Sequence, residues 1–290
     1  MKILVTGATG KLGRKVVESL LKSVPPDQLA VSVRNPAKAE DLKNLGIDVR
    51  HGDFDQPETL DKAFAGIDRL LIISTDGDND TRIRQHLNAV SAAQQANVGF
   101  IAYTSVVNAQ QNKLSLGIVH KTTENAIIKT GIPYTFLRNN WYLENEIQGI
   151  KGALAGNPWV TSAETGKVGW ALQQDYAEAA SAVMAGKNHE NKIYELSGKL
   201  LTQEELVSDL EAVTGKTIPV LKVDDVKYAE IIKWAGAPDF LVLFLLDIQK
   251  NIREGELAIE SNDFEKLLGR PATPVHDALS KIISAISSNS

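Results

Sequence analysis

The sequence predicts an α/β protein with a doubly wound parallel sheet and a smaller α+β lobe in its C-terminal half. Two observations predict the sheet: apolar strand-like runs alternate with amphipathic stretches up to about residue 140, and a glycine-rich turn joins the first such pair. The alternation then weakens, and helical patterns dominate from Gln203 onward. We therefore expect a first domain over residues 1–140 and a second lobe over residues 141–290, and the pattern allows the chain to cross back between the two.

The first strand-like run, Met1–Val5, leads directly into a turn with the glycine spacing G-x-x-G-x-x-G. Glycine at these positions lets the backbone bend sharply, approach a pyrophosphate closely and pack the next helix against the strand. The first amides of that helix then face the anion. The alternative is an ordinary tight turn, but the flanking strand and helix favour a Rossmann dinucleotide site formed by Gly7, Thr9, Gly10, Lys11, Leu12 and Gly13.

The following segments continue the strand and helix alternation. We expect further strands at residues 29–34, 47–51, 69–74, 100–104 and 134–138. Helical patterns lie between them near residues 36–45, 57–65, 80–96 and 119–130. Each helix makes a right-handed crossover, which keeps the strands parallel and covers both faces of the sheet. Residues 193–196 look like an isolated strand of the second lobe.

The residue at the end of the second strand bears on the choice of dinucleotide. Proteins that prefer NAD place a carboxylate about 20 residues past the glycines to bind the ribose 2′-hydroxyl, whereas this chain has Arg34. A guanidinium attracts a 2′-phosphate and can stack on adenine, so we expect NADPH as the cofactor. Lys11 and Lys38 would add positive potential. The alternative for all three side chains is a solvated surface charge.

Two later strand ends are expected to line the same groove. Asp53 and Phe54 follow the third strand, where the carboxylate can accept from the adenine amino group and the ring can border it. Ser74 and Thr75 follow the fourth strand, beside the point where the strand order of an open α/β sheet reverses and ligands collect. Each of these residues has the alternative role of a turn or a helix cap.

Composition narrows the classes of function. The net charge of −5, with both signs interspersed, disfavours nucleic-acid binding and a basic membrane-binding helix. The chain has no cysteine, and its five histidines do not fall at metal-ligand spacing, so we expect neither a disulfide nor a metal site. Because Met1 opens into a strand and no apolar run is long enough to span a bilayer, we expect a cytoplasmic protein.

Five segments match a known pattern: Thr6–Gly13, Val33–Pro36, His51–Phe54, Ile101–Ser105 and Leu137–Asn145. With them the chain resembles the NmrA-like, atypical branch of the short-chain dehydrogenase/reductase superfamily, and within it the bacterial NADPH-dependent quinone reductases and triphenylmethane dye reductases. The likeness runs nearly full length and includes residues 189–196 and 266–271. The glycine motif is common to the superfamily, whereas the stretch 138–145 is much more specific.

The resemblance implies further site residues. In that family the segment after the sixth strand borders the nicotinamide, which places residues 139–142 of this chain near the reacting end of the cofactor. Trp141 and Tyr142 have the alternative role of packing the two lobes together. The cofactor contacts implied in this way are Thr104, Ser105, Arg138, Asn139, Asn140, Trp141 and Tyr142.

A catalytic pair of ordinary short-chain dehydrogenases is missing. They reduce ketones with Tyr-x-x-x-Lys, in which the lysine lowers the tyrosine pKa, but none of the six tyrosines here has a lysine four residues later. Where the resemblance would place the pair, the chain has Leu116 and His120. A quinone suits such a site, because hydride addition gives a weakly basic oxyanion that can take its proton from water.

His120, Asn139 and Tyr142 are the candidate catalytic residues. His120 would supply a proton or orient the nicotinamide amide, since the unperturbed histidine pKa lies near neutrality. The alternative is a histidine on a helix surface. The neighbouring Lys121 would touch either the cofactor or solvent.

The apolar run 234–246 lies in the second lobe. The favoured interpretation is a buried helix. The alternatives are an apolar pocket for the hydride acceptor or the interface of a homodimer, because both use such surfaces.

These observations predict an NADPH-dependent oxidoreductase that transfers hydride to a quinone or a similar conjugated electrophile, with the second lobe binding the acceptor. NmrA-like proteins also include regulators that sense the dinucleotide and bind a protein partner without turnover, which is the main alternative. Epimerisation of a sugar nucleotide ranks below both, since the tyrosine–lysine pair is absent.

Overall fold

The apolar runs form one seven-stranded sheet in which all neighbouring strands are parallel. The computed structural model describes residues 1–288. Strands at the centre of the sheet are buried on both faces, which is why they read as continuous rather than alternating apolar runs. Across the sheet the order is β3 (Asp48–His51), β2 (Leu29–Val33), β1 (Ile3–Thr6), β4 (Arg69–Ile72), β5 (Phe100–Val106), β6 (Tyr134–Asn139) and β8 (Lys192–Leu196).

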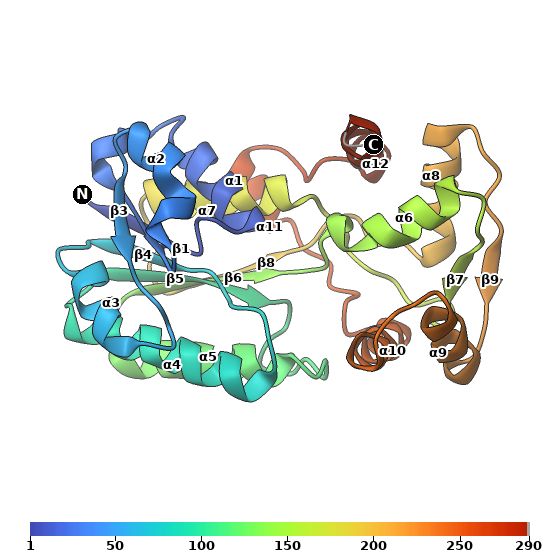
Figure 1. Cartoon of the computed structure of the whole chain (residues 1–290), viewed down its shortest axis with the longest axis horizontal. Coiled ribbons are helices and arrows are strands. Elements are labelled where there is room, and N and C mark those ends of the chain that lie inside the picture. Colours follow the sequence, from blue (N-terminus) through green and yellow to red (C-terminus); the bar gives the residue numbers. More distant parts are fainter. Residues whose placement is uncertain (289–290) are drawn as a thin grey trace.

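Helices cover both faces of this sheet (Figure 1). Successive side chains of β1 point to opposite faces, so Ile3 and Val5 join one hydrophobic core and Leu4 joins the other. The first core is closed by α1 (Lys11–Leu20), α2 (Glu40–Asn44), α7 (Gln173–Ala185) and α11 (Asp263–Leu268). The second is closed by α3 (Pro57–Phe64), α4 (Asn79–Gln95) and α5 (Gly117–Thr130). The predicted doubly wound sheet is confirmed.

A second lobe has its own hydrophobic core beyond the carboxyl end of β5, since Val106 and Val107 belong to that core. It contains a short parallel pair of strands and several helices, on the right of Figure 1. Three short 3₁₀ turns, η1 (Pro26–Gln28), η2 (Pro36–Ala39) and η3 (Leu143–Glu146), complete the connections. The elements of the second lobe are α6 (Ile147–Leu154), β7 (Trp159–Thr161), α8 (Gln203–Thr214), β9 (Val220–Lys222), α9 (Asp225–Trp234), α10 (Asp239–Arg253) and α12 (Val275–Ser288).

The expected isolated strand at residues 193–196 is wrong. β8 pairs in parallel with β6, with Glu195 opposite Arg138, and the preceding α7 packs against α1. The chain therefore leaves the first lobe after β6, builds part of the second and returns for α7 and β8. The strand itself was expected, but its pairing was not, because it is a half-solvated edge strand with Ile193 exposed and does not read as part of a buried sheet. The domain boundary at residue 140 stays a prediction.

The expectation of a buried helix for the apolar run 234–246 is wrong for much of the run. Val242 faces the core, but Phe240 is 75% exposed, Leu243 is 68% exposed and Trp234 is 90% exposed. A continuous apolar run winds around a helix, so a neighbour on one side covers only part of it. No helix within residues 1–288 is long and apolar enough to cross a membrane.

Candidate functional site

The turn after β1 has two positions at which only glycine fits. Gly7 has a φ of +63°, in the left-handed region, and its N–H donates to the carbonyl of Ser32 on β2 (3.2 Å). A Cβ at Gly13 would lie 2.2 Å from the carbonyl oxygen of Gly7, so a side chain there would push α1 away from the turn. The N-cap Gly10 offers no side-chain acceptor, and the first turn of α1 has no acidic residue. The first amides of α1 are therefore open to an anion.

Positive charge lies beside this turn at the end of β2. Thr6 and Ser32 are paired across β1 and β2, which brings Arg34 to the same edge of the sheet. Arg34 is exposed, and within the described residues no hydrogen bond or ion pair engages its guanidinium. Lys11 and Lys38 are also exposed. These residues fit NADPH: open amides for its pyrophosphate and an unpaired guanidinium for its 2′-phosphate.

Asp53 and Phe54 have partners within the protein. The carboxylate of Asp53 accepts from the N–H of Asp55 (3.0 Å) and from the side chain of Gln56 (3.4 Å), as in a turn. Phe54 is only 8% exposed and packs in the core under α3 and α4. The alternative role of turn and core residues accounts for these contacts, and an adenine contact stays a prediction.

The strand order reverses between β1 and β4, which is the position at which open α/β sheets have a ligand-binding crevice. Threonine hydroxyls shape it, since Thr6 Oγ1 accepts from the N–H of Ile73 and Thr104 Oγ1 accepts from the N–H of Ser74 (both 2.9 Å). Thr75 is held in the same way, because its N–H donates to His86 Nε2 (2.9 Å). The segment after β4 is thus fixed by side chains rather than by the strand ladder.

Asn139 and Tyr142 meet at the end of β6. The Nδ2 of Asn139 donates to the hydroxyl of Tyr142 (2.9 Å), while its Oδ1 is buried without a partner. This acceptor is free to bind a donor, and a carboxamide N–H, such as that of nicotinamide, is a donor of the right kind. Burial, above all, raises the pKa of Tyr142 to about 12, so it is a neutral phenol.

Asn140 and Trp141 connect the two lobes. Asn140 Nδ2 donates to Ser197 Oγ (3.0 Å) and to the carbonyl of Leu257 (2.9 Å). Trp141 Nε1 donates to Glu146 Oε1 (3.0 Å), and its ring lies 6.4 Å from that of Phe244. The side-chain amide of Asn140 is therefore used inside the protein, and the packing alternative for Trp141 gains support.

Ser105 and Arg138 are held by the fully buried Glu124. Ser105 Oγ donates to one carboxylate oxygen (2.7 Å), and the Nη2 of Arg138 donates to the other (2.7 Å). The Nη1 of Arg138 donates to Glu195 on β8 (2.8 Å). This network joins β5, α5, β6 and β8, so the side chains of Ser105 and Arg138 have structural partners, and their cofactor contacts stay predictions.

His120 does not lie on a helix surface, and that alternative is wrong. It is 5% exposed, with Nδ1 2.9 Å from the hydroxyl of Tyr103 and Nε2 3.4 Å from the Nη2 of Arg82. Burial, followed by the nearby charge of Arg82, holds the pKa of His120 well below its usual value. The ring is therefore neutral and has no imidazolium proton to donate. Lys121 is exposed.

Sequence reasoning missed Arg82, His86 and Tyr103, which surround His120. Tyr103 projects from β5 into the layer between α4 and α5, where its hydroxyl lies 3.4 Å from His86 Nδ1. Arg82 and His86 stand four residues apart on one side of α4, so both reach the same space. That spacing was the available signal, since a helix that covers a sheet rarely turns a cation and a histidine inward.

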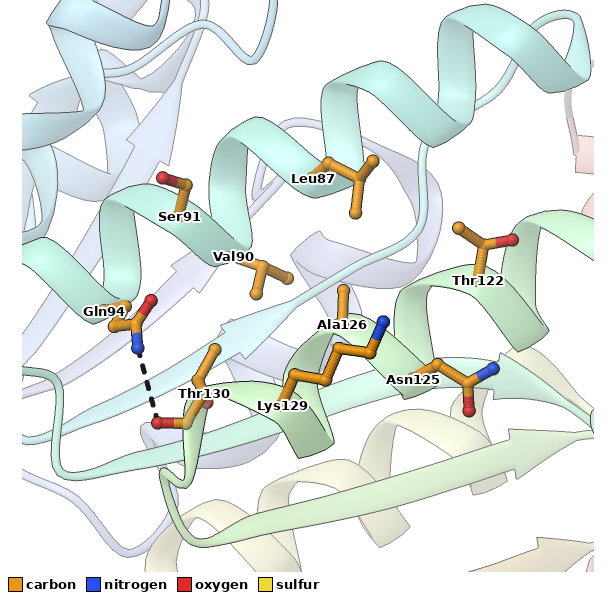
Figure 2. Close-up of a pocket in the computed structure, with 9 residues that line it drawn as sticks. All are labelled: Leu87, Val90, Ser91, Gln94, Thr122, Asn125, Ala126, Lys129 and Thr130. Carbon is orange, nitrogen blue, oxygen red and sulfur yellow. Dashed lines mark hydrogen bonds between the residues drawn. The ribbon is translucent and has the colours of Figure 1, made fainter.

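A surface hollow between α4 and α5 lies apart from the predicted site residues. Figure 2 shows it on the outer side of the two helices, with Gln94 donating to the carbonyl of Thr130 (3.4 Å) at one end. None of the predicted site residues lines it. Among the described residues, no three His, Asp or Glu side chains lie close enough to hold a metal ion.

A doubly wound parallel sheet with an open glycine turn and an unpaired arginine at the second strand end defines the class of Rossmann-fold dinucleotide-binding proteins. Within this class the chain belongs to the NmrA-like family, whose profile matches residues 1–259.

The chain is similar along nearly its whole length to known reductases. It is 38% identical over 283 residues to quinone oxidoreductase 2 of Escherichia coli (strain K12), covering 97% of this chain and 99% of that protein. Its structure matches that of Citrobacter sp. triphenylmethane reductase complexed with NADP(H), with a TM-score of 0.93 and 38% identity over 97% of this chain and 100% of that one. It also matches the E. coli NADPH-dependent quinone oxidoreductase QOR2 complexed with NADPH, with a TM-score of 0.93 and 38% identity over 97% and 99% of the two chains.

Proposed function

We propose that this chain is an NADPH-dependent oxidoreductase that transfers hydride to a quinone or a similar conjugated acceptor. The observation that carries the proposal is the similarity, over nearly the full length of both chains, to a quinone oxidoreductase and a triphenylmethane reductase that have been crystallised with this cofactor. The open glycine turn and the unpaired Arg34 support the same cofactor.

The cofactor would lie across the carboxyl ends of the strands. The turn Gly7–Gly13 and the first amides of α1 would bind the pyrophosphate, Arg34 would bind the 2′-phosphate, and Ser74 and Thr75 would line the crevice. The buried Oδ1 of Asn139 would accept from the nicotinamide carboxamide and so fix which face of the ring meets the acceptor.

The bound cofactor would supply the hydride, and the protein would align the two reactants and exclude water. His120 is neutral and the pKa of Tyr142 is raised to about 12, chiefly by burial, so neither matches a general acid near neutral pH. A quinone tolerates this lack, because its reduced oxyanion is weakly basic and takes a proton from water. A simple ketone does not, because its alkoxide is far more basic.

The test is the fall in the near-ultraviolet absorbance of NADPH when benzoquinone, a naphthoquinone or a triphenylmethane dye is added to the purified protein. We expect rapid oxidation with at least one acceptor and a much slower reaction with NADH. A protein that binds NADPH tightly but leaves its absorbance unchanged with every acceptor is a dinucleotide sensor, and that result would exclude the enzyme proposal.

We also propose that the protein is a cytoplasmic homodimer. The absence of cysteine supports a reducing compartment, and the exposed Phe240 and Leu243 support contact between two copies. Light scattering tests the second point: Leu243→Asp should shift a dimer to monomers, and a wild-type monomer at micromolar concentration would contradict it.

A further inference from the structure

Two arginines differ from all the others in the described chain. Every other arginine within residues 1–288 donates to a carboxylate or to a backbone carbonyl. Arg34 and Arg82 have neither. Arg34 is exposed, and the proposed function already gives it the 2′-phosphate of NADPH as a partner. Arg82 is half-buried, and no partner has been proposed for it. A half-buried guanidinium without an acceptor is costly, which indicates that its acceptor comes from outside the protein.

The geometry of Arg82 supports this. Its Nε is buried without a partner, and its Nη2 has only His120 Nε2 at the long distance of 3.4 Å. Because a guanidinium can only donate, Nε2 must be the accepting nitrogen, and Nδ1 then carries the proton that faces Tyr103. His120 is thus a neutral and weak acceptor, unable to balance the charge of Arg82.

The other neighbours of Arg82 are equally uncharged. His86 Nε2 accepts from the N–H of Thr75, so its proton is on Nδ1, 2.9 Å from the hydroxyl of Thr123. Burial, followed by the charge of Arg82, lowers the pKa of His86 to about 3. Burial also raises the pKa of Tyr103, which keeps the phenol neutral. The network around Arg82 therefore contains no anion.

Arg82 is in the first turn of α4, and we call this side of the crevice, where Ser74 and Thr75 lie, its acceptor end. Its helix begins directly after the Ser74–Thr75 segment, at the strand-order reversal. The exposed Asp76 in that connection acts electrostatically on both Arg82 and Tyr142, so it lies near both side chains. Asp76 does not come within ion-pair distance of Arg82, so the guanidinium stays available.

We propose that Arg82 binds the oxygen of the hydride acceptor on which negative charge develops. This rests on the proposed function and deepens it. In the reaction, a hydride passes from NADPH to the quinone and leaves NADP⁺ and the quinol monoanion. Water then protonates the monoanion to the quinol. Arg82 stabilises the monoanion by a charge-assisted hydrogen bond that strengthens as the hydride arrives.

The proposal defines a substrate class. Acceptors whose reduction creates an oxyanion gain from Arg82, whereas a cationic triphenylmethane dye becomes neutral on reduction and is repelled by the guanidinium beforehand. This chain should therefore favour quinones over cationic dyes, and removing the charge should reverse part of that preference.

The experiment compares Arg82→Gln with the matched control Arg84→Gln. Arg84 lies two residues away on the same helix, is exposed and pairs with Asp55 (2.9 Å). One measurement uses the protein without cofactor and titrates it with 2-hydroxy-1,4-naphthoquinone, an anion at neutral pH, and with the neutral 2-methyl-1,4-naphthoquinone. A second measurement determines kcat/KM of each variant with NADPH and either benzoquinone or a cationic triphenylmethane dye.

Arg82→Gln should weaken binding of the anionic naphthoquinone by about 10- to 100-fold and lower kcat/KM for benzoquinone by a similar factor, since a charged hydrogen bond is lost. Binding of the neutral naphthoquinone and of NADPH should stay within about twofold, and kcat/KM for the dye should not fall. Arg84→Gln should change none of these quantities.

Unchanged affinity for the anion, or an equal loss with benzoquinone and the dye, overturns the proposal. If Arg82→Gln does not fold, Arg82→Lys and Arg84→Lys replace the pair, and the lysine at position 82 should lose affinity for the anion because it lacks the planar fork. Failure of the proposed function gives a different result: the wild-type protein would bind the anion through Arg82 and yet oxidise no NADPH.

Discussion

The two ends of the crevice are built by different means. At the glycine end, Gly7, Gly10 and Arg34 are exposed, while the apolar side of α1 is buried against the sheet. At the acceptor end, Arg82, His86, Tyr103 and His120 form a buried network whose protons are fixed by their partners. We therefore expect added side-chain atoms to impair the glycine end. The acceptor end should instead be weakened by the loss of a charge or by the uptake of a proton.

The largest effect should come from the ion pair behind the acceptor end. Arg138→Met leaves the carboxylate of Glu124 buried without its cation, so the free energy of unfolding should fall by about 3–5 kcal/mol. Urea denaturation measures it. Lys250→Met, which removes an exposed partner of Glu254, is the control and should have almost no effect. A loss no larger than that of the control would contradict the importance of this ion pair for stability.

Acid should weaken the acceptor end more than the glycine end. The pKa of His86 is lowered from 6.5 to about 3, chiefly by burial, so below pH 6.5 only the unfolded chain takes up the proton. The stability that neutral His86 provides is present above pH 6.5 and is lost as the pH falls towards 3, at about 1.4 kcal/mol per pH unit.

Urea denaturation at pH 7 and pH 5 checks this, and His86→Gln should reduce the difference between the two conditions. An identical pH dependence in His86→Gln and the wild type would contradict the assignment.

At the glycine end, a single methyl group should suffice to impair cofactor binding. Gly13→Ala places Cβ against the backbone of Gly7, which cannot move without displacing α1 from β1, and we expect a loss of about 1–3 kcal/mol in stability and weaker NADPH binding. Thermal unfolding and calorimetric titration measure the two. Gly152→Ala in α6 meets only ordinary contacts at 3.8 Å and should bind NADPH like the wild type. Normal binding by Gly13→Ala would mean that the turn does not hold the cofactor.

The smallest expected effect is that of Arg34→Ala, which tests the glycine end with two nucleotides that differ only in the 2′-phosphate. Arg34→Ala should raise the Michaelis constant for NADPH by about tenfold, because one charged hydrogen-bond partner is lost, and should spare NADH. Lys43→Ala, an exposed cation on α2, is the control. Steady-state kinetics with both nucleotides decide the matter: equal losses for the two would rule out the 2′-phosphate as the partner of Arg34.

The glycine end could be predicted from the sequence, and the acceptor end only in part. Gly7, Gly13 and Arg34 are close to one another in the chain or at the ends of adjacent strands, so spacing and strand order suffice to bring them together. Tyr103 meets His86 and His120 only because β5 packs against both α4 and α5. This packing belongs to the tertiary structure and leaves no signal in the local sequence. The buried acceptor of Asn139 is likewise a property of packing and not of a motif.

The strands of the first lobe were predictable for a physical reason. A strand buried on both faces is mostly apolar, and β1, β2 and β4 each have a single polar or charged residue. β8 and the first turns of α10 are partly exposed to solvent, where the burial of a residue constrains its type less strongly. Those two segments are where the sequence-based expectations were wrong.

The return of the chain to complete the first sheet also governs the order of events during synthesis. A ribosome must translate past residue 196 before β8 can cover the edge of β6, and α7 must emerge before the apolar side of α1 is covered. Until then the nascent chain carries an unpaired strand edge and a bare helix face, both of which promote aggregation. A protein truncated at residue 140 should accordingly collect in inclusion bodies, whereas in the uninterrupted chain β8 covers the strand edge as soon as it is made.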